Sequence, residues 1–273
     1  MPENRPSISM FSWFGYFQGA RERFRIIREA GFDGVMLGWE DELEPELIPR
    51  QQLAAMARKE GLRVVNAHAP FIGWNRIWTD TPEEITDMTG RFRQWIRECG
   101  EENIPVFVVH TSDMDLEPGY SIDNGLAFYR TLAEEAERSN VKLAVENVSR
   151  QFLLREVLDH VESEAIGFCY DCSHDYMLPC GRGRLLHDYS DRIAAVHLSD
   201  NDLYLDRHWI PGEGQIPYAE IMPFLKKSPL DEISLEVLKS REDTRTPEQF
   251  CAAAARAAGK LVELYMEAAL PEN

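Results

Sequence analysis

Eight short apolar runs, separated by segments with helical periodicity, are the feature of this sequence that most restricts its fold. The runs are Ser7–Phe14, Gly34–Trp39, Leu62–Pro70, Pro105–Ser112, Lys142–Val148, Ile166–Ser173, Ala195–Asp200 and Glu232–Val237. Helical stretches such as Gly19–Phe32 and Glu83–Asn103 lie between them, and Thr246–Leu270 closes the chain behind a threonine cap. Strands that alternate with helices form parallel sheets with right-handed crossovers. Eight such units predict an α/β fold, the (β/α)8 TIM barrel.

A doubly wound open sheet is the competing architecture for such a pattern. It usually carries a glycine-rich fingerprint after its first strand, and no such motif follows Ser7–Phe14. The 273 residues contain no linker and no low-complexity segment, and barrels of this size are commonly one domain. We therefore expect a single domain over residues 1–273.

The charge balance of the chain restricts its partners. Lys and Arg number 29 against 47 Asp and Glu, which gives a formal charge of -18. Such a surface repels phosphate backbones, so nucleic acid is not an expected partner. The densest basic stretch, Arg21–Arg25, fits the solvated face of a helix.

The sequence also indicates a compartment. No basic segment followed by an apolar stretch opens the chain, and no run approaches eighteen apolar residues, so we expect no signal peptide and no membrane span. Five cysteines, an odd number, favour a reducing compartment, and we expect the cytoplasm. The Cys169–Cys172 pair is a Cys-x-x-Cys match, but it lies across a strand and not at a helix N-terminus.

Metal-ligand side chains gather at the ends of six successive predicted strands. They are His68, His110, Glu146, Asp171 and His174, His197 with Asp206 and His208 in its loop, and Glu236. Active sites of barrels lie at the C-terminal ends of the strands. Because side chains alternate along a strand, Glu146 shares its face with Ala144 and His197 shares its face with Ala195. The sequence therefore predicts that these groups point into the barrel mouth.

Any one of these residues taken alone could be a packed core residue or an ion-pair partner. Nine of them buried together would be unstable without cations to neutralise them. A mixture of imidazoles and carboxylates suits Zn²⁺, Mn²⁺ or Fe²⁺ better than Ca²⁺. We expect one to three divalent cations per chain, with zinc, manganese and magnesium as the ions to test.

Over nearly its whole length the chain resembles the xylose isomerase-like TIM barrels, which include sugar and sugar-phosphate isomerases and epimerases and also endonuclease IV. The resemblance implies one metal held by Glu146, Asp171, His197 and Glu236. The endonuclease IV pattern adds two zinc sites, one with His68, His110 and Glu146, the other with His174, Asp206 and His208. The loop Asp206–Tyr218, "DRHWIPGEGQIPY", is similar to the loop of that pattern. Its Gly212-Glu213-Gly214 turn is expected to use the freedom of glycine at positive φ.

The resemblance implies an isomerase or epimerase that acts through an enediolate, with a small sugar or sugar phosphate as its partner. A divalent ion would polarise a carbonyl and the hydroxyl beside it. Glu146 and Glu236 would move the proton, and His174 would contact substrate oxygens. Trp13, Phe14 and Trp39 are expected either to form an apolar wall of the site or to pack in the core.

Other functions stay open on the sequence. A multinuclear zinc phosphoesterase like endonuclease IV would use all nine ligands, although the acidic charge opposes a DNA substrate. Lys239 and Arg241 could bind one phosphate or could be exposed charges at a helix start. A non-catalytic metal-binding barrel and a dehydratase that uses a similar enolate are further alternatives. A homo-oligomer is compatible with the sequence.

Overall fold

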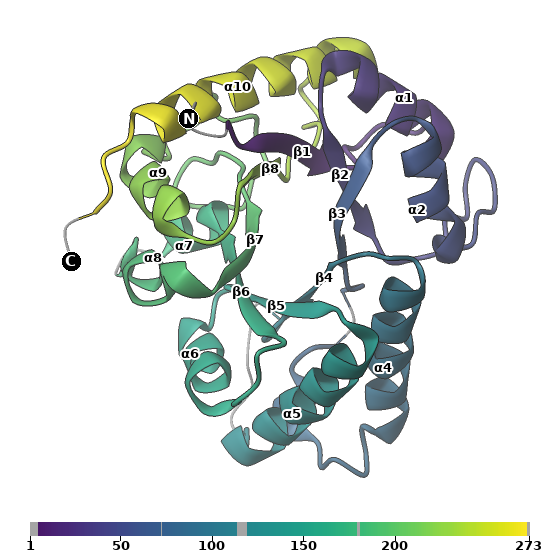
Figure 1. Ribbon diagram of the computed structural model, residues 1–273, viewed down its shortest axis with the longest axis vertical. Coiled ribbons are helices and arrows are strands. Elements are labelled where there is room, and N and C mark those ends of the chain that lie inside the picture. The colour runs from purple at the N-terminus through teal and green to yellow at the C-terminus, as the bar shows by residue number, and fades with distance from the viewer. Residues whose placement is uncertain (1–4, 72, 114–118, 179–180, 272–273) are drawn as a thin grey trace.

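The computed structural model describes residues 5–71, 73–113, 119–178 and 181–271, and these form a barrel of strands inside a ring of helices (Figure 1). The strands are β1 (Ser7–Phe11), β2 (Gly34–Gly38), β3 (Arg63–His68), β4 (Val106–His110), β5 (Lys142–Glu146), β6 (Ile166–Asp171), β7 (Ile193–His197) and β8 (Glu232–Leu235). Neighbouring strands pair in parallel, in the order β7-β6-β5-β4-β3-β2-β1-β8. The predicted TIM barrel is confirmed.

The barrel closes between β7 and β8 through a single parallel bridge, Leu198 to Leu235. The Leu198 N–H donates to the Ser234 carbonyl at 2.9 Å, and the Glu236 N–H donates to the Leu198 carbonyl at 3.1 Å. These bonds lie just beyond the C-terminal ends of both strands, so they bring the last residues of β7 and β8 together at the mouth.

Helices cover the outside of the strands (Figure 1). They are α1 (Ala20–Ala30), α2 (Arg50–Lys59), α3 (Arg76–Thr79), α4 (Thr86–Glu101), α5 (Ile122–Ser139), α6 (Gln151–His160), α7 (Cys172–Met177), α8 (Arg184–Tyr189), α9 (Tyr218–Lys227) and α10 (Pro247–Glu267), with a 3-10 turn at Ser190–Arg192. The predicted cap of the last helix is present: the Thr246 hydroxyl accepts from the Gln249 N–H, and the Gln249 side chain accepts from the Thr246 N–H. No helix of the described residues is long and apolar enough to cross a membrane.

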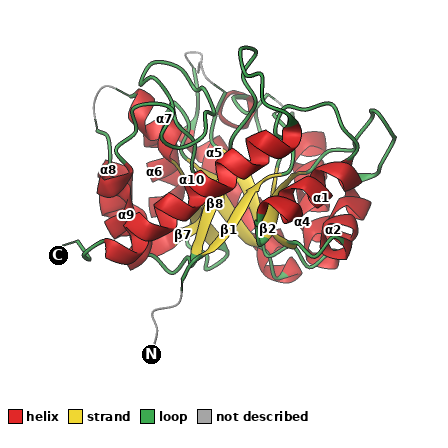
Figure 2. Ribbon diagram, turned by 90° about the horizontal axis from the view of Figure 1, so that it is seen from above, coloured by secondary structure: helices red, strands yellow, loops and turns green. Residues whose placement is uncertain are grey.

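The predicted strands differ from the observed ones mainly at their C-terminal ends. The first run was expected to extend to Phe14, but β1 ends at Phe11. Residues at these ends leave the strand ladder because they turn outward into the loops. Figure 2 shows the long loops gathered at one end of the barrel, opposite the end where β1 begins.

Small side chains fill the barrel interior beneath this mouth. Val108, Ala144, Cys169 and Ala195 form a buried cluster separate from the larger core between strands and helices. Ala144 and Ala195 lie one pleat below Glu146 and His197, which confirms the predicted alternation of faces. Their small volume leaves the strand ends free to point polar groups inward.

Candidate metal centre

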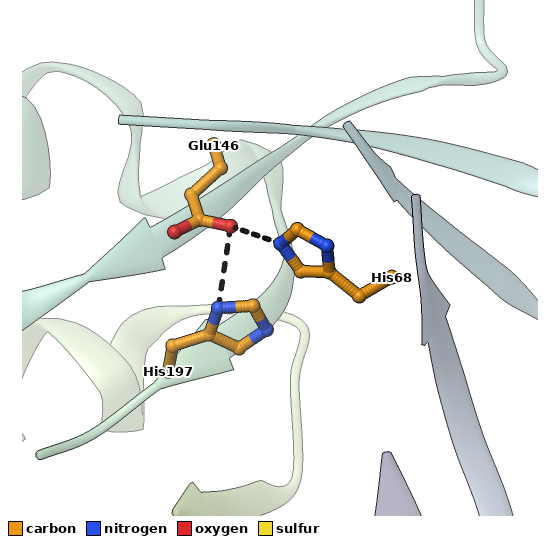
Figure 3. A group of neighbouring side chains, drawn as sticks. All are labelled: His68, Glu146 and His197. Carbon is orange, nitrogen blue, oxygen red and sulfur yellow. Dashed lines mark hydrogen bonds and ion pairs between the residues drawn. The ribbon is translucent and has the colours of Figure 1, made fainter. Parts of the chain in front are cut away.

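Glu146, the last residue of β5, is the hub of a buried cluster at the mouth (Figure 3). Its Oε2 lies 3.1 Å from His68 Nε2, 3.3 Å from His197 Nδ1 and 3.6 Å from His110 Nε2. Its Oε1 lies 3.3 Å from His174 Nδ1. One carboxylate thus contacts four imidazoles that the sequence carries on β3, β4, β7 and the turn after β6.

Four buried residues at the ends of β5 to β8 can offer ligands to one ion. Atoms of Glu146, Asp171, His197 and Glu236 all lie within 4.8 Å of one another, and His68, Glu146 and His197 form a second such group. His197 Nδ1 is 3.2 Å from Glu236 Oε2. The expected four-ligand set is therefore brought together by the fold.

Several buried polar atoms in this cluster have no hydrogen-bond partner within the described chain. They are His110 Nε2, Asp171 Oδ2 and both ring nitrogens of His197. Buried polar groups are nearly always satisfied, so such a concentration calls for a ligand. A divalent cation fits, because imidazole nitrogens and carboxylate oxygens are the donors that zinc, manganese and iron use.

Three histidines are oriented in the same way by backbone carbonyls. The Nδ1 atoms of His68, His174 and His208 lie 2.7, 2.9 and 3.1 Å from the carbonyl oxygens of Ala69, Asn147 and Glu236. Such a bond places a proton on Nδ1 and leaves Nε2 as the acceptor. Each Nε2 then faces a carboxylate oxygen, and two acceptors in contact need a proton or a metal ion between them.

The loop after β7 brings a further carboxylate to this cluster. Asp206 Oδ2 lies 3.2 Å from His174 Nε2 and 2.9 Å from His208 Nε2. The Ser173 hydroxyl donates to Asp206 Oδ1 at 2.7 Å. The predicted Asp206 and His208 pair therefore meets His174, and all nine predicted residues belong to one connected cluster.

Asp200, which the sequence reasoning did not single out, shapes this loop from inside. Its buried carboxylate accepts the N–H of Gly212 at 2.7 Å and that of Ile216 at 3.0 Å. Asp200 also pairs with Trp209 in an antiparallel bridge. The loop is thus folded back over the strand end, which fixes where Asp206 and His208 lie. The only indication of this role in the sequence was the run of three polar residues, 199–201, shortly after β7.

Asn147 is a second residue that the sequence reasoning missed. Its side chain accepts the Asp171 N–H at 2.7 Å and donates to the Asp171 carbonyl at 2.8 Å. This pair of bonds joins the ends of β5 and β6 and so fixes Asp171 beside Glu146. A polar residue directly after a strand-end glutamate is a weak signal by itself.

The carboxylates of the centre differ in their protonation. Burial opposes ionisation of Glu146, yet His197 and His110 hold its pKa well below the ordinary value. Burial likewise opposes ionisation of Glu236, and His197 lowers its pKa to about 2. Burial raises the pKa of Asp171 to about 7. Glu146 and Glu236 are therefore ionised at neutral pH and are able to accept a proton or bind a cation.

Acidic neighbours raise the pKa of three histidines of the centre, His174, His197 and His208, although burial opposes their charge; for His174 the neighbour with the largest effect is Asp171. Burial opposes charge on His208, but its hydrogen bond to Asp206 raises its pKa to about 10. Burial also opposes charge on His197, while Cys169 and Glu236 raise its pKa well above the usual value. The carboxylates of the cluster therefore favour positive charge between them, as a proton or as a bound cation.

Of the two alternatives for Trp13, Phe14 and Trp39, an apolar wall or core packing, the structure shows core packing for the last two. Phe14 and Trp39 are fully buried. Phe14 stacks on Phe250, and the Trp39 indole N–H donates to Glu98 at 3.1 Å, so both belong to the packing between strands and helices. Trp13 is 42% exposed.

The remaining residues singled out from the sequence lie as follows. The Lys239 ammonium lies 4.9 Å from the centre of the Tyr16 ring, and Arg241 is exposed. Cys169 lies on β6 inside the barrel, but Cys172 is the first residue of α7, so the expectation that the pair lies within a strand was wrong for Cys172. The Cys172 thiol donates to the Ser199 carbonyl at 3.2 Å. Burial raises the pKa of both thiols, which opposes the thiolate that redox chemistry needs.

Comparison with known families agrees with this geometry. The family described as "Xylose isomerase-like TIM barrel" matches residues 24–258. The chain belongs to this family. Among curated proteins, an uncharacterized protein of Sinorhizobium fredii, y4fM, is 28% identical over 245 residues, 76% of each chain. The uncharacterized protein MJ1311 of Methanocaldococcus jannaschii is 26% identical over 205 residues, 66% of this chain and 67% of that protein.

Solved structures share the xylose isomerase-like fold. L-ribulose 3-epimerase superposes with a TM-score of 0.78 at 18% identity, over 96% of both chains. The 3-keto-D-glucoside 4-epimerase YcjR from E. coli gives 0.72 at 18% identity, over 94% of this chain and 98% of that one. A xylose isomerase-like TIM barrel/4-hydroxyphenylpyruvate dioxygenase fusion protein gives 0.78 at 18% identity, and the chain covers 44% of its length. Identities this low show the fold alone.

Proposed function

We propose that this xylose isomerase-like barrel is a divalent-metal-dependent isomerase or epimerase of a small sugar or sugar phosphate. The observation that carries the proposal is the buried set of Glu146, Asp171, His197 and Glu236, whose ligand atoms lie within 4.8 Å of one another at the barrel mouth. Sugar epimerases among the structures with the same fold support it.

The proposed chemistry is a proton transfer next to a carbonyl. A divalent cation in the four-ligand set would polarise the carbonyl and the hydroxyl beside it. One of the two ionised carboxylates, Glu146 or Glu236, takes the proton from the carbon beside the carbonyl, which leaves an enediolate. In an isomerisation the same carboxylate returns that proton to the neighbouring carbon. In an epimerisation the second carboxylate, once protonated from solvent, adds a proton to the opposite face of the same carbon, and the first then releases its proton to solvent. His174 contacts substrate oxygens from the side of Asp206.

The first experiment measures metal content and turnover together. Elemental mass spectrometry on protein purified without added metal is expected to give about one manganese, magnesium or zinc per chain. Ketoses, aldoses and their phosphates are then screened in D₂O, where proton exchange labels the reacting carbon. Glu146→Gln is expected to lower turnover by about a thousandfold or more while the barrel stays folded. Glu101→Gln, on the exposed side of α4, is the matched control. Full activity of Glu146→Gln would remove this residue from the mechanism.

A multinuclear zinc phosphoesterase is the second candidate. The observation that favours it is the shared orientation of His68, His174 and His208, whose Nε2 atoms all face carboxylates. About three zincs per chain, with hydrolysis of a phosphodiester such as bis-p-nitrophenyl phosphate, would place this function first. Metal binding without turnover on either substrate panel would instead favour a non-catalytic barrel.

A further inference from the structure

Exposed apolar side chains are concentrated on the segments that follow the C-terminal ends of the strands. Nine of the ten large apolar side chains that are exposed in the described chain lie between the end of a strand and the first turn of the next long helix. These nine, which we name the mouth rim, are Trp13, Phe17, Leu43, Leu47, Phe71, Tyr120, Phe152, Tyr204 and Leu205. Leu270, the tenth, follows α10. The loops that carry most of the rim form one end of the molecule (Figure 2).

Phe71 joins the mouth rim to the metal centre. Its ring stacks on the imidazole of His68, with centroids 5.3 Å apart and an interplanar angle of 22°. It also meets the edge of His110 at 4.7 Å. The residue is nevertheless 72% exposed. An aromatic ring that rests on two candidate ligands while much of its surface stays in water offers a platform to whatever enters the mouth.

A second aromatic pair follows the next two strands, with Tyr120 in the loop after β4 and Phe152 in the first turn of α6. The rings of Tyr120 and Phe152 are 5.8 Å apart, and both side chains are exposed. Because β3, β4 and β5 are neighbours in the sheet, this pair and Phe71 follow adjacent strands. The rim therefore carries aromatic surface after successive strands of the barrel.

Two of the arginines on the loops after the strands are neutralised by acidic neighbours. Arg207 is paired with Asp202 at 2.8 Å, and the guanidinium of Arg245 contacts Asp243 at 2.9 Å. The whole chain carries a formal charge of -18. A neutral molecule with apolar surface matches this environment better than a phosphate ester does.

We propose that the substrate is a glycoside, a sugar joined to an aromatic or similarly apolar group, and that this group packs on Phe71 and the mouth rim while the sugar reaches the metal centre. The proposal rests on the function proposed above for the sugar half. Because the glycosidic bond occupies the anomeric carbon, the carbonyl must be an oxo group elsewhere on the ring. The proton lost from the carbon beside it is returned, so the reaction needs no co-reactant.

The apolar rim could instead bind a second copy of this chain. Two facts favour a small molecule. The Phe71 ring contacts His68 and His110 inside the mouth, and side chains on a flat protein surface would not reach that depth. Two chains of charge -18 also repel each other.

The test is calorimetric binding to the metal-loaded protein with pairs of neutral probes. Methyl and phenyl glycosides of glucose, galactose, mannose and xylose differ only in the group that the rim would contact. For at least one sugar we expect the phenyl glycoside to bind about tenfold more tightly or better. Phe71→Ala should abolish this preference and leave the methyl glycoside unaffected. Phe71→Tyr, which keeps the ring, should retain it, and Leu270→Ala is the matched control.

Three results would overturn the proposal. The first is equal binding of the phenyl and methyl glycoside for every sugar, including no binding of either. The second is a preference for the phenyl glycoside that survives Phe71→Ala at equal metal content. The third is a dimer in sedimentation equilibrium that Tyr204→Ala dissociates. Turnover of free sugars without a phenyl preference would contradict only this inference. A chain that binds no metal would contradict the proposed function itself.

Discussion

Two glycines in the loop after β7 are required for different physical reasons. Gly212 has a φ of +94°, a conformation that other residues adopt at a cost. At Gly214 the constraint is space: a Cβ there would lie 2.3 Å from the Asn201 carbonyl oxygen and 2.4 Å from Asp200 Oδ1. The expectation of a left-handed turn was therefore right for Gly212, whereas Gly214 allows the backbone to approach Asp200 closely.

Alanine substitutions separate these two effects. Gly214→Ala is expected to lower the free energy of unfolding by about 2 kcal/mol or more, because backbone and the buried Asp200 must move. Gly212→Ala should cost about 1 kcal/mol for the left-handed backbone. Gly259→Ala, in α10 where no atom lies within 4 Å of the new methyl, should instead stabilise by up to about 1 kcal/mol. Urea unfolding measures all three, and a Gly214→Ala variant as stable as the parent chain would contradict the close approach.

At the scale of elements, one carboxylate on α4 joins three parts of the barrel wall. Glu98 accepts hydrogen bonds from Arg50 Nε at 2.8 Å and from Arg50 Nη2 at 2.9 Å. It also accepts hydrogen bonds from the Trp39 indole N–H at 3.1 Å and from the Gln51 side-chain amide at 3.0 Å. α2, α4 and the end of β2 are therefore fixed to one another by a largely buried, bidentate ion pair.

Replacement of Arg50 should show how much this ion pair contributes to the free energy of unfolding. Arg50→Ala is expected to lower the free energy of unfolding by about 2 kcal/mol at pH 7, between the values for buried and exposed pairs. Arg21→Ala, whose ion pair with Glu60 is largely exposed, should change it by less than about 0.5 kcal/mol.

The same pair predicts a pH dependence with a definite sign. Burial would raise the pKa of Glu98, but the hydrogen bonds from Arg50 and Gln94 hold it below the ordinary 4.5. The stability that this group contributes is therefore present above pH 4.5 and is lost as the pH falls through the lowered pKa. In urea unfolding from pH 7 to pH 3, the difference between parent and Arg50→Ala should shrink in acid. A constant difference would show that the ionised pair is not its source.

At the scale of the whole molecule, the mouth is the part whose stability depends on bound cations. Carboxylates and histidines from β3 to β8 converge there, and several of their buried atoms make no hydrogen bond within the described chain. A metal bound only by the folded chain, at a hundredfold excess over its Kd, adds about 2.7 kcal/mol. Chelation should therefore lower Tm by about 5 °C. Scanning calorimetry before and after treatment with EDTA, and again after reloading with zinc or manganese, measures this, and an unchanged Tm would contradict a metal centre.

The sequence by itself determined the barrel and the end of it that carries the site. Both follow from local rules: eight alternations of apolar runs with helical segments require parallel strands, and a period of two along a strand puts Glu146 on the face of Ala144. The residue types at the strand ends could therefore be predicted from the sequence.

Only the tertiary structure decided how these residues act on one another. The imidazole of His208 is turned by the carbonyl of Glu236, and the loop that carries it is folded by Asp200. Trp39 and Phe14, which follow their strands as closely as the ligands do, pack outward among the helices. The groups that contact these side chains lie far apart in the sequence or on neighbouring loops, so no local periodicity encodes the contacts. The orientation of each side chain depends on which carbonyls, carboxylates and rings the closed barrel brings near it.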